Sequence, residues 1–142
     1  MSATRISAAQ RRRVMEAFRF RCAYCHTPQR IIGPLLELDH IIPESQGGAS
    51  DDDNLCSACP MCNGHKADRG EAVDPQSGAV VRLFHPWLER WGDHFEWTED
   101  GAGIRGKTPT GRATTDALDM NNPDMVSARR LWAIAGWHPP AD

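Results

Sequence analysis

Five cysteines stand out among the residues of this 142-residue chain that can do chemistry. Four of them form two Cys-x-x-Cys pairs, Cys22 with Cys25 and Cys59 with Cys62, and 33 residues lie between the pairs. A two-residue spacer lets one turn present both sulfurs to one ion, and Zn²⁺ prefers four tetrahedral thiolate ligands. The spacing therefore predicts a structural Zn²⁺ site made by these four cysteines. Four protein ligands leave no open position for catalysis, so catalytic residues must lie elsewhere.

The fifth cysteine, Cys56, repeats the same interval ahead of Cys59 and offers an alternative thiolate. We interpret Cys56 as a small buried hydrophobe, because Cys59 and Cys62 lie on the turn that opens the expected helix. An odd number of cysteines argues against a disulfide framework, and a reducing cytoplasm keeps thiols available for metal. We expect a cytoplasmic protein without membrane association, since no apolar run approaches the ~18 residues of a membrane span.

Oxygen and imidazole ligands fill the segment between and beside the cysteine pairs. The segment contains Asp39-His40-Ile41-Ile42-Pro43 and Asp53-Asn54-Leu55, and the second cysteine pair continues through Asn63 to Lys66. His40 is a candidate general base, because imidazole accepts a proton near neutral pH. Asp39 and Asn63 offer hard oxygen ligands of the kind that hold Mg²⁺ together with waters and substrate phosphate. Lys66, one helical turn beyond Asn63, is a candidate phosphate contact.

This order of motifs, from about Arg21 to Arg69, resembles the HNH endonuclease family. The resemblance implies a ββα-metal core in which His40 activates water and Asn54 steadies that histidine. It also implies that Asp39 and Asn63 hold one catalytic Mg²⁺ or Mn²⁺, and that DNA is cut to leave a 5′-phosphate and a 3′-hydroxyl. The helix residue is asparagine where other members have histidine, a variant that the family also uses.

Taken one at a time, these residues have ordinary structural explanations. A strand histidine is usually a core residue, Asp39 and Asn54 are common capping residues, and Lys66 can be a solvated side chain. Neighbours on a regular strand also point to opposite faces, so Asp39 and His40 share a site only if the strand bends or ends there. The alternative functions are a non-catalytic zinc-ribbon module that binds nucleic acid or protein, and an inactive relative retained for structure.

Charge is unevenly distributed along the chain, although the net charge is only −3. Residues 1–30 carry seven arginines and one glutamate, whereas residues 31–70 carry two basic and seven acidic side chains. We expect Arg11, Arg12 and Arg13 to contact the DNA backbone, which gives affinity without reading bases. The acidic run Asp51–Asp53 is then expected to face away from DNA. One such site cuts one strand, so double-strand cleavage requires a homodimer or a second cutting event.

The elements that must position these groups are predicted from periodicity and capping residues. We expect a helix from Ser7 to Phe20, a strand from Leu35 to Ile42 and a helix from Cys59 to Arg69 that is capped by Gly70. A final helix begins with Asn122 as N-cap and Pro123 as first residue and ends at Gly136.

The fold class is therefore predicted as α+β, with a zinc-stapled core. An arginine-rich helix occupies residues 1–20, the nuclease core residues 21–70, and a strand and helix extension that packs on the core residues 71–142. In the extension, turns at 74–78 and 98–103 separate strand-like segments. The residues His85, Trp87, Trp91, His94 and Trp97 are interpreted as a satellite core, because their spacing is irregular and their neighbours are apolar.

Overall fold

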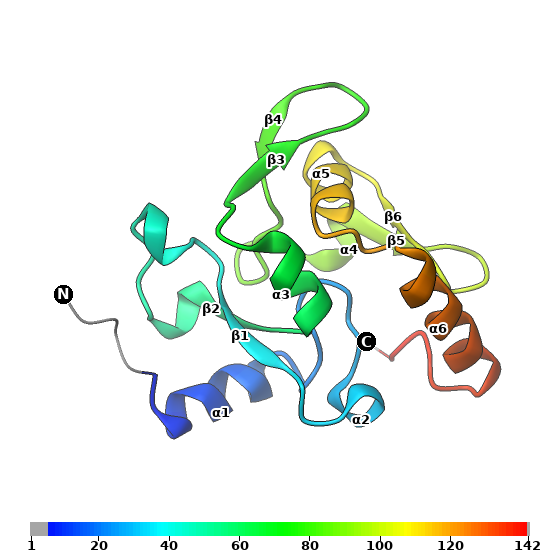
Figure 1. Ribbon diagram of the computed structural model, residues 1–142, viewed down its shortest axis with the longest axis horizontal. Helices are drawn as coiled ribbons and strands as arrows, with labels where there is room; N and C mark the ends of the chain where they lie inside the picture. Colours follow the sequence, from blue (N-terminus) through cyan, green and yellow to red (C-terminus); the bar gives the residue numbers. More distant parts are fainter. Residues whose placement is uncertain (1–5, 142) are drawn as a thin grey trace. The chain divides into compact units, whose positions relative to one another are not determined.

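The first helix delivers the chain into the first cysteine pair. In the computed structural model, which describes residues 6–141, α1 runs over Ala8–Ala17 (Figure 1). Ser7 caps it as expected, since its hydroxyl accepts a hydrogen bond from the Gln10 amide at 3.0 Å. The helix ends before the predicted Phe20, because Arg19 and Phe20 adopt positive φ angles of 58° and 53°. This left-handed turn breaks the helical hydrogen-bond pattern and redirects the backbone toward Cys22.

Two short antiparallel strands carry the residues between the cysteine pairs. Strand β1 covers Glu37–His40 and strand β2 covers Leu55–Ala58, with Asp39 opposite Cys56 and His40 opposite Leu55. All of β2 is buried, whereas only Asp39 is fully buried in its partner strand β1. The predicted strand Leu35–Ile42 is too long at both ends. A short helix, α2 (Gln29–Ile32), precedes β1.

A loop of two 3-10 turns, η1 (Glu44–Gln46) and η2 (Asp52–Asn54), joins the strands. Gly47 has a φ of 89°, which an L side chain rarely adopts. A Cβ added to Gly48 would lie 1.7 Å from the Ile42 carbonyl oxygen. The Gly47-Gly48 pair therefore lets the loop fold back tightly onto the end of β1.

Helix α3 (Pro60–Lys66) starts at the second cysteine pair and lies beside β1 in Figure 1. Cys59 is the N-cap and Pro60 the first helical residue, as predicted. The predicted end is wrong, because the helix stops at Lys66 and Ala67 takes a φ of 52°. Ala67, rather than Gly70, leaves the helical region of backbone space.

The described chain falls into two compact units. The first comprises residues 6–70 together with His85–Leu88, and the second comprises residues 71–84 and 89–141. Each unit mixes helices with a small antiparallel sheet, so the fold class is α+β. The packing of the extension on the core stays a prediction.

The second unit contains two hairpins and three helices. Strands β3 (Glu71–Val73) and β4 (Val80–Arg82) form one hairpin, and β5 (Phe95–Trp97) and β6 (Ile104–Gly106) form the other. Both turns lie where the sequence predicted them. The helices are α4 (Trp91–His94), α5 (Pro109–Ala117) and α6 (Pro123–Ile134). Helix α6 has the predicted Asn122 cap, whereas α5 was not predicted.

Aromatic rings pack against one another within each unit. In the second unit Trp91 lies 5.2 Å from both Phe95 and Trp97, measured between ring centroids, and Trp97 lies 4.5 Å from His138. Trp87 belongs instead to the first unit, where its ring meets Phe18 edge-on at 4.9 Å. Trp91 and Trp97 therefore pack against neighbouring rings as predicted, whereas Trp87 lies in the first unit and is 40% exposed. Among residues 6–141, no helix is long and apolar enough to cross a bilayer.

Candidate functional site

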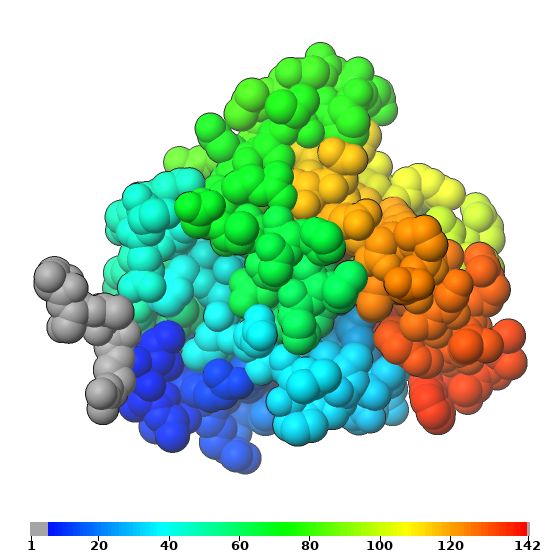
Figure 2. All heavy atoms as spheres, in the orientation of Figure 1, coloured from blue at the N-terminus to red at the C-terminus, as the bar shows by residue number. Residues whose placement is uncertain are grey.

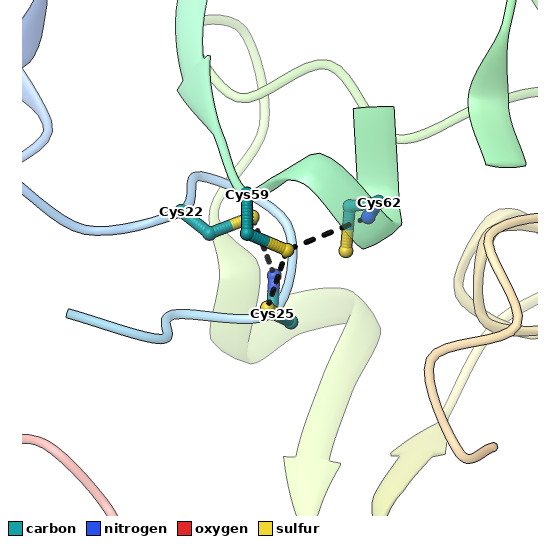
Figure 3. Close-up of side chains that lie close together, drawn as sticks. All are labelled: Cys22, Cys25, Cys59 and Cys62. Carbon is teal, nitrogen blue, oxygen red and sulfur yellow. Dashed lines mark hydrogen bonds between the residues drawn. The ribbon is translucent and has the colours of Figure 1, made fainter. Parts of the chain in front are cut away.

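The four paired cysteines converge on one point, two from the loop after α1 and two from the start of α3 (Figure 3). Their sulfur atoms all lie within 4.8 Å of one another, and all four side chains are buried. The Cys25 and Cys59 sulfurs are 3.7 Å apart. Tetrahedral ligands at a Zn–S distance of about 2.3 Å are about 3.8 Å apart, so this cluster has the dimensions of a zinc site.

Backbone amides in both pairs support negative charge on the sulfurs. The Cys25 amide lies 3.4 Å from Cys22 Sγ, and the Cys62 amide lies 3.4 Å from Cys59 Sγ. Hydrogen bonds from the Cys22 thiol and the other two thiols lower the pKa of Cys25, whereas burial raises the pKa of Cys22. The donor chemistry and geometry both fit a structural Zn²⁺, which would join the loop after α1 to α3.

Cys56 lies outside this cluster, as the sequence predicted. It is fully buried on β2, and its sulfur lies 3.9 Å from Asp39 Oδ2. Burial, followed by the nearby Asp39 carboxylate, raises the pKa of Cys56 well above its usual value. The side chain therefore stays a neutral thiol and packs as a small hydrophobe.

Two residues of α3 contact alternate residues of β1. Asn63 Nδ2 donates to Glu37 Oε1 at 2.8 Å, and the Lys66 ammonium lies 3.2 Å from each carboxylate oxygen of Asp39. The spacing follows from the elements, because residues i and i+3 share a helix face and residues i and i+2 share a strand face. Asp39 and Asn63 thus both lie where β1 and α3 meet, although each contacts a different residue of the other element.

The Asp39 carboxylate is saturated with partners. Besides Lys66 it accepts a 2.6 Å hydrogen bond from the Tyr24 hydroxyl, and both Asp39 and Lys66 are buried. Burial raises the pKa of Asp39, an effect opposed by the Lys66 ammonium and by the Tyr24 hydroxyl. Lys66 Nζ also donates to the His40 carbonyl at 2.9 Å. Lys66 is therefore buried, and its ammonium does not lie at the surface.

The carboxylate and carboxamide of Asp39 and Asn63 are donors that suit Mg²⁺ or Mn²⁺. Glu37, in contact with Asn63, adds a third oxygen-bearing side chain that sequence analysis did not single out. The donor set therefore fits a hard divalent cation. Because Lys66 contacts both oxygens of Asp39, a cation bound to this carboxylate must replace the ammonium.

His40 presents its ring to the loop that follows β1. Its Nε2 atom lies 2.8 Å from Ser50 Oγ and 3.8 Å from Glu44 Oε1, and the side chain is 20% exposed. Asp39 contacts Tyr24 and Lys66 instead, so the two neighbours serve different sets of partners, as strand alternation requires. The ring is thus fixed at one nitrogen and remains partly open to solvent.

Asn54 holds the same loop through its own hydrogen bonds. None of the described hydrogen bonds joins Asn54 to the His40 ring. Its Oδ1 accepts from the Ile42 amide at 2.9 Å, and its Nδ2 donates to the carbonyls of Ile42 and Ala49 at 3.0 and 2.8 Å. These three bonds tie the end of β1 to the residue before Ser50. Asn54 therefore reaches His40 only through the loop backbone.

Each arginine of the triplet in α1 has a partner. Arg11 Nη2 donates to the Leu36 carbonyl at 2.8 Å, and Arg12 pairs with Glu16 at 2.8 Å. Arg13 forms two hydrogen bonds with Asp52, at 2.9 and 3.3 Å. The Arg12 side chain is 74% exposed, against 59% for Arg13, and Arg12 borders, with Arg11, a pocket of about 280 Å³.

Sequence analysis missed three residues that contact the site. Glu37 carried a detectable signal, because strand alternation places it on the same face as Asp39. Tyr24 lies inside the first Cys-x-x-Cys pair, but nothing in its spacing indicates a carboxylate partner. The contact of Ser50 with His40 depends on the path of a folded-back loop, and no local pattern predicts it.

A comparison with models of known protein families gives a match in this region of the chain. Residues 22–69 match the model described as HNH endonuclease, a stretch that holds all four clustered cysteines together with His40, Asn54 and Asn63. No curated protein and no solved structure matched the chain. The family match and the cysteine cluster fall in the same stretch, so residues 22–69 are similar to the HNH endonuclease family.

Proposed function

We propose that this protein is a divalent-metal-dependent endonuclease that hydrolyses DNA phosphodiester bonds with His40 as general base. One observation carries the proposal: His40, whose imidazole contacts Ser50, directly follows Asp39 on β1, and Asn63 of α3 contacts Glu37 of the same strand. The family match over residues 22–69 supports a nuclease and a DNA substrate.

His40 supplies the proton acceptor that hydrolysis needs. Its unbonded ring nitrogen takes a proton from water, and the resulting hydroxide attacks phosphorus in line with the 3′ oxygen. The bond between phosphorus and the 3′ oxygen breaks, the departing oxygen takes a proton from solvent water, and the products are a 5′-phosphate and a 3′-hydroxyl. Asp39 and Asn63 are the residues that would hold the divalent cation, which when bound supplies positive charge for the phosphate and the departing oxygen.

Substrate binding is assigned to the arginines of α1. In the space-filling view α1 (blue) and the loop after β1 (turquoise) lie at the surface (Figure 2). Arg11 and Arg12 border the same pocket, and arginine forms bidentate contacts with phosphate. Arg13 already donates a hydrogen bond to Asp52, so it is a weaker candidate for a phosphate contact than Arg11 and Arg12. Lys66 reaches a phosphate only if it leaves Asp39.

The cellular location is inferred from the thiol chemistry. Four thiolates that bind zinc require a reducing compartment, so we place the protein in the cytoplasm.

One site cuts one strand, and cleavage of both strands therefore requires a homodimer or a second cutting event.

The deciding experiment measures nicking of supercoiled plasmid in Mg²⁺, Mn²⁺ or EDTA. His40→Ala is expected to lower the nicking rate by about 100-fold or more, the contribution of a positioned general base. His65→Ala is the matched control, because His65 is an exposed histidine on α3 outside the site. Zinc content and far-UV circular dichroism establish that both variants fold. Nicking by His40→Ala at the wild-type rate would refute the proposed function.

The second candidate is a non-catalytic zinc module that binds nucleic acid. The saturation of Asp39 by Lys66 and Tyr24 favours it, because a pure binder needs no open carboxylate. This alternative predicts DNA binding that needs no added Mg²⁺ or Mn²⁺ and survives the His40→Ala substitution, with no nicking in either metal.

A further inference from the structure

We infer that Ser50 is the positioning residue for His40, and that it holds the proton on Nε2 so that Nδ1 is the atom that accepts a proton from water. The inference rests on the proposed function and concerns a residue of the same site. It is carried by the 2.8 Å contact between His40 Nε2 and Ser50 Oγ. No motif in the sequence assigns a role to Ser50.

The first step concerns what an imidazole base requires. A neutral histidine carries one N–H and one lone pair, and only the nitrogen with the lone pair accepts a proton. The other nitrogen decides the tautomer through the hydrogen bond that it makes. A hydroxyl that accepts from Nε2–H therefore leaves the Nδ1 lone pair for the water molecule. After proton transfer the same bond persists, because the imidazolium still donates from Nε2.

The second step is that Ser50 is held in place. Ser50 is buried, with 8% of its surface exposed, and its carbonyl accepts a 2.6 Å hydrogen bond from Gln10 Nε2 of α1. The carbonyl of Ala49 accepts a 2.8 Å bond from Asn54 Nδ2. Bonds from two different elements thus fix the backbone on both sides of the serine peptide. A hydroxyl on such a clamped loop can orient a ring, whereas one on a mobile loop cannot.

The third step compares Ser50 with the other polar neighbour of the same nitrogen. Glu44 Oε1 lies 3.8 Å from Nε2, beyond hydrogen-bond distance, and its side chain is half exposed. Its charge adds modest stabilisation to an imidazolium through partly solvated surroundings. The short contact is with Ser50, so this hydroxyl rather than the carboxylate is the hydrogen-bond partner of Nε2.

The test uses the full zinc-loaded chain and three variants. Ser50→Ala removes the hydroxyl, Ser50→Thr keeps it, and Glu44→Gln removes only the neighbouring charge. Steady-state nicking separates kcat from KM for plasmid, and ¹⁵N NMR of labelled histidine reports the tautomer of His40. The His40 signals are assigned by their absence from the spectrum of His40→Ala.

Ser50→Ala is expected to lower kcat by about tenfold or more, a part of the effect of the base itself, while KM changes by less than about twofold. The ¹⁵N shifts of His40 should move from the Nε2–H form toward a mixture of tautomers. Ser50→Thr should retain both kcat and the Nε2–H form, and Glu44→Gln should leave the tautomer unchanged. A serine that only stabilises the loop would not shift the tautomer.

The outcomes separate this inference from the proposed function. Nicking that depends on His40 but not on Ser50, with an unchanged tautomer in Ser50→Ala, overturns the inference alone. Nicking that does not depend on His40 overturns the proposed function, and the inference falls with it. A tautomer change in Glu44→Gln but not in Ser50→Ala would transfer the role to Glu44.

Discussion

The Lys66 ammonium and the Asp39 carboxylate form a buried ion pair, with Nζ 3.2 Å from each carboxylate oxygen. The pair links α3 to β1, and Tyr24 ties it to the first cysteine pair through a 2.6 Å hydrogen bond. Lys66 also donates to the carbonyl of His40. Through Tyr24, Asp39 and Lys66, the loop of the first cysteine pair, strand β1 and helix α3 are joined.

Removing Lys66 is expected to destabilise the first unit strongly. Lys66→Met leaves the Asp39 carboxylate buried without its cation, which costs about 3–5 kcal/mol of unfolding free energy. Urea unfolding of the full chain, followed by far-UV circular dichroism, measures the loss. The double variant Lys66→Met with Asp39→Asn removes the buried charge and should recover much of the stability. A double variant no more stable than the single one would contradict a charge-based explanation.

Zinc loss is expected to unfold the cysteine cluster. Cys59→Ser removes one thiolate that also caps α3, and because zinc binding energy is folding energy in such sites, both bound zinc and thermal stability should fall. Elemental analysis of the purified protein measures the stoichiometry, and a melting curve measures the stability. Cys56→Ala is the matched control and should keep its zinc. A loss of zinc in that variant would mean that Cys56 is a ligand.

Asn54→Ala is expected to loosen the loop that presents Ser50. The substitution leaves the Ile42 amide and two carbonyls without their side-chain partner, at a cost of about 1–3 kcal/mol in local stability. Hydrogen exchange at Ile42 should accelerate, and kcat for nicking should fall with little change in KM. Asn54→Asp keeps the acceptor for the Ile42 amide but loses both donor bonds. It should therefore protect Ile42 better than alanine does; equal exchange in the two variants would argue against the assigned bonds.

Acid is expected to weaken the second unit through Asp74. Arg112 forms two hydrogen bonds with Asp74, both 2.9 Å long, and with Ser77 it holds the pKa of Asp74 well below its ordinary value of 3.8. A carboxyl whose folded pKa is lowered contributes stability at pH values above its unfolded pKa. That contribution is lost as the pH falls from about 4 toward the folded pKa.

Urea unfolding at several pH values between about 7 and 2.5 tests this sign. Asp74→Asn should be less stable than the wild type at neutral pH and should lose less stability on acidification. Asp116→Asn, on the same helix as Arg112 and exposed, should follow the acid profile of the wild type. Parallel profiles for the wild type and Asp74→Asn would exclude a role for this ion pair in acid stability.

Local signals predicted the helix starts. Ser7, Cys59 and Asn122 cap their helices as expected, because a cap is an interaction between residues two or three positions apart. The hairpin turns were predicted for the same reason. The predicted ends of helices and strands were less accurate. Arg19, Phe20 and Ala67 take left-handed backbone angles, which these residue types do not predict.

The sequence by itself identified the four cysteines that cluster, because the covalent chain sets the ligand spacing within each pair, and it also gave the candidate residues between them. Only the tertiary structure decided the partners of those residues: Lys66 for Asp39, Glu37 for Asn63 and Ser50 for His40. These contacts join residues 10 to 27 positions apart, and they depend on strand register and loop path. Register and loop path follow from the packing of the whole unit, which no local pattern encodes.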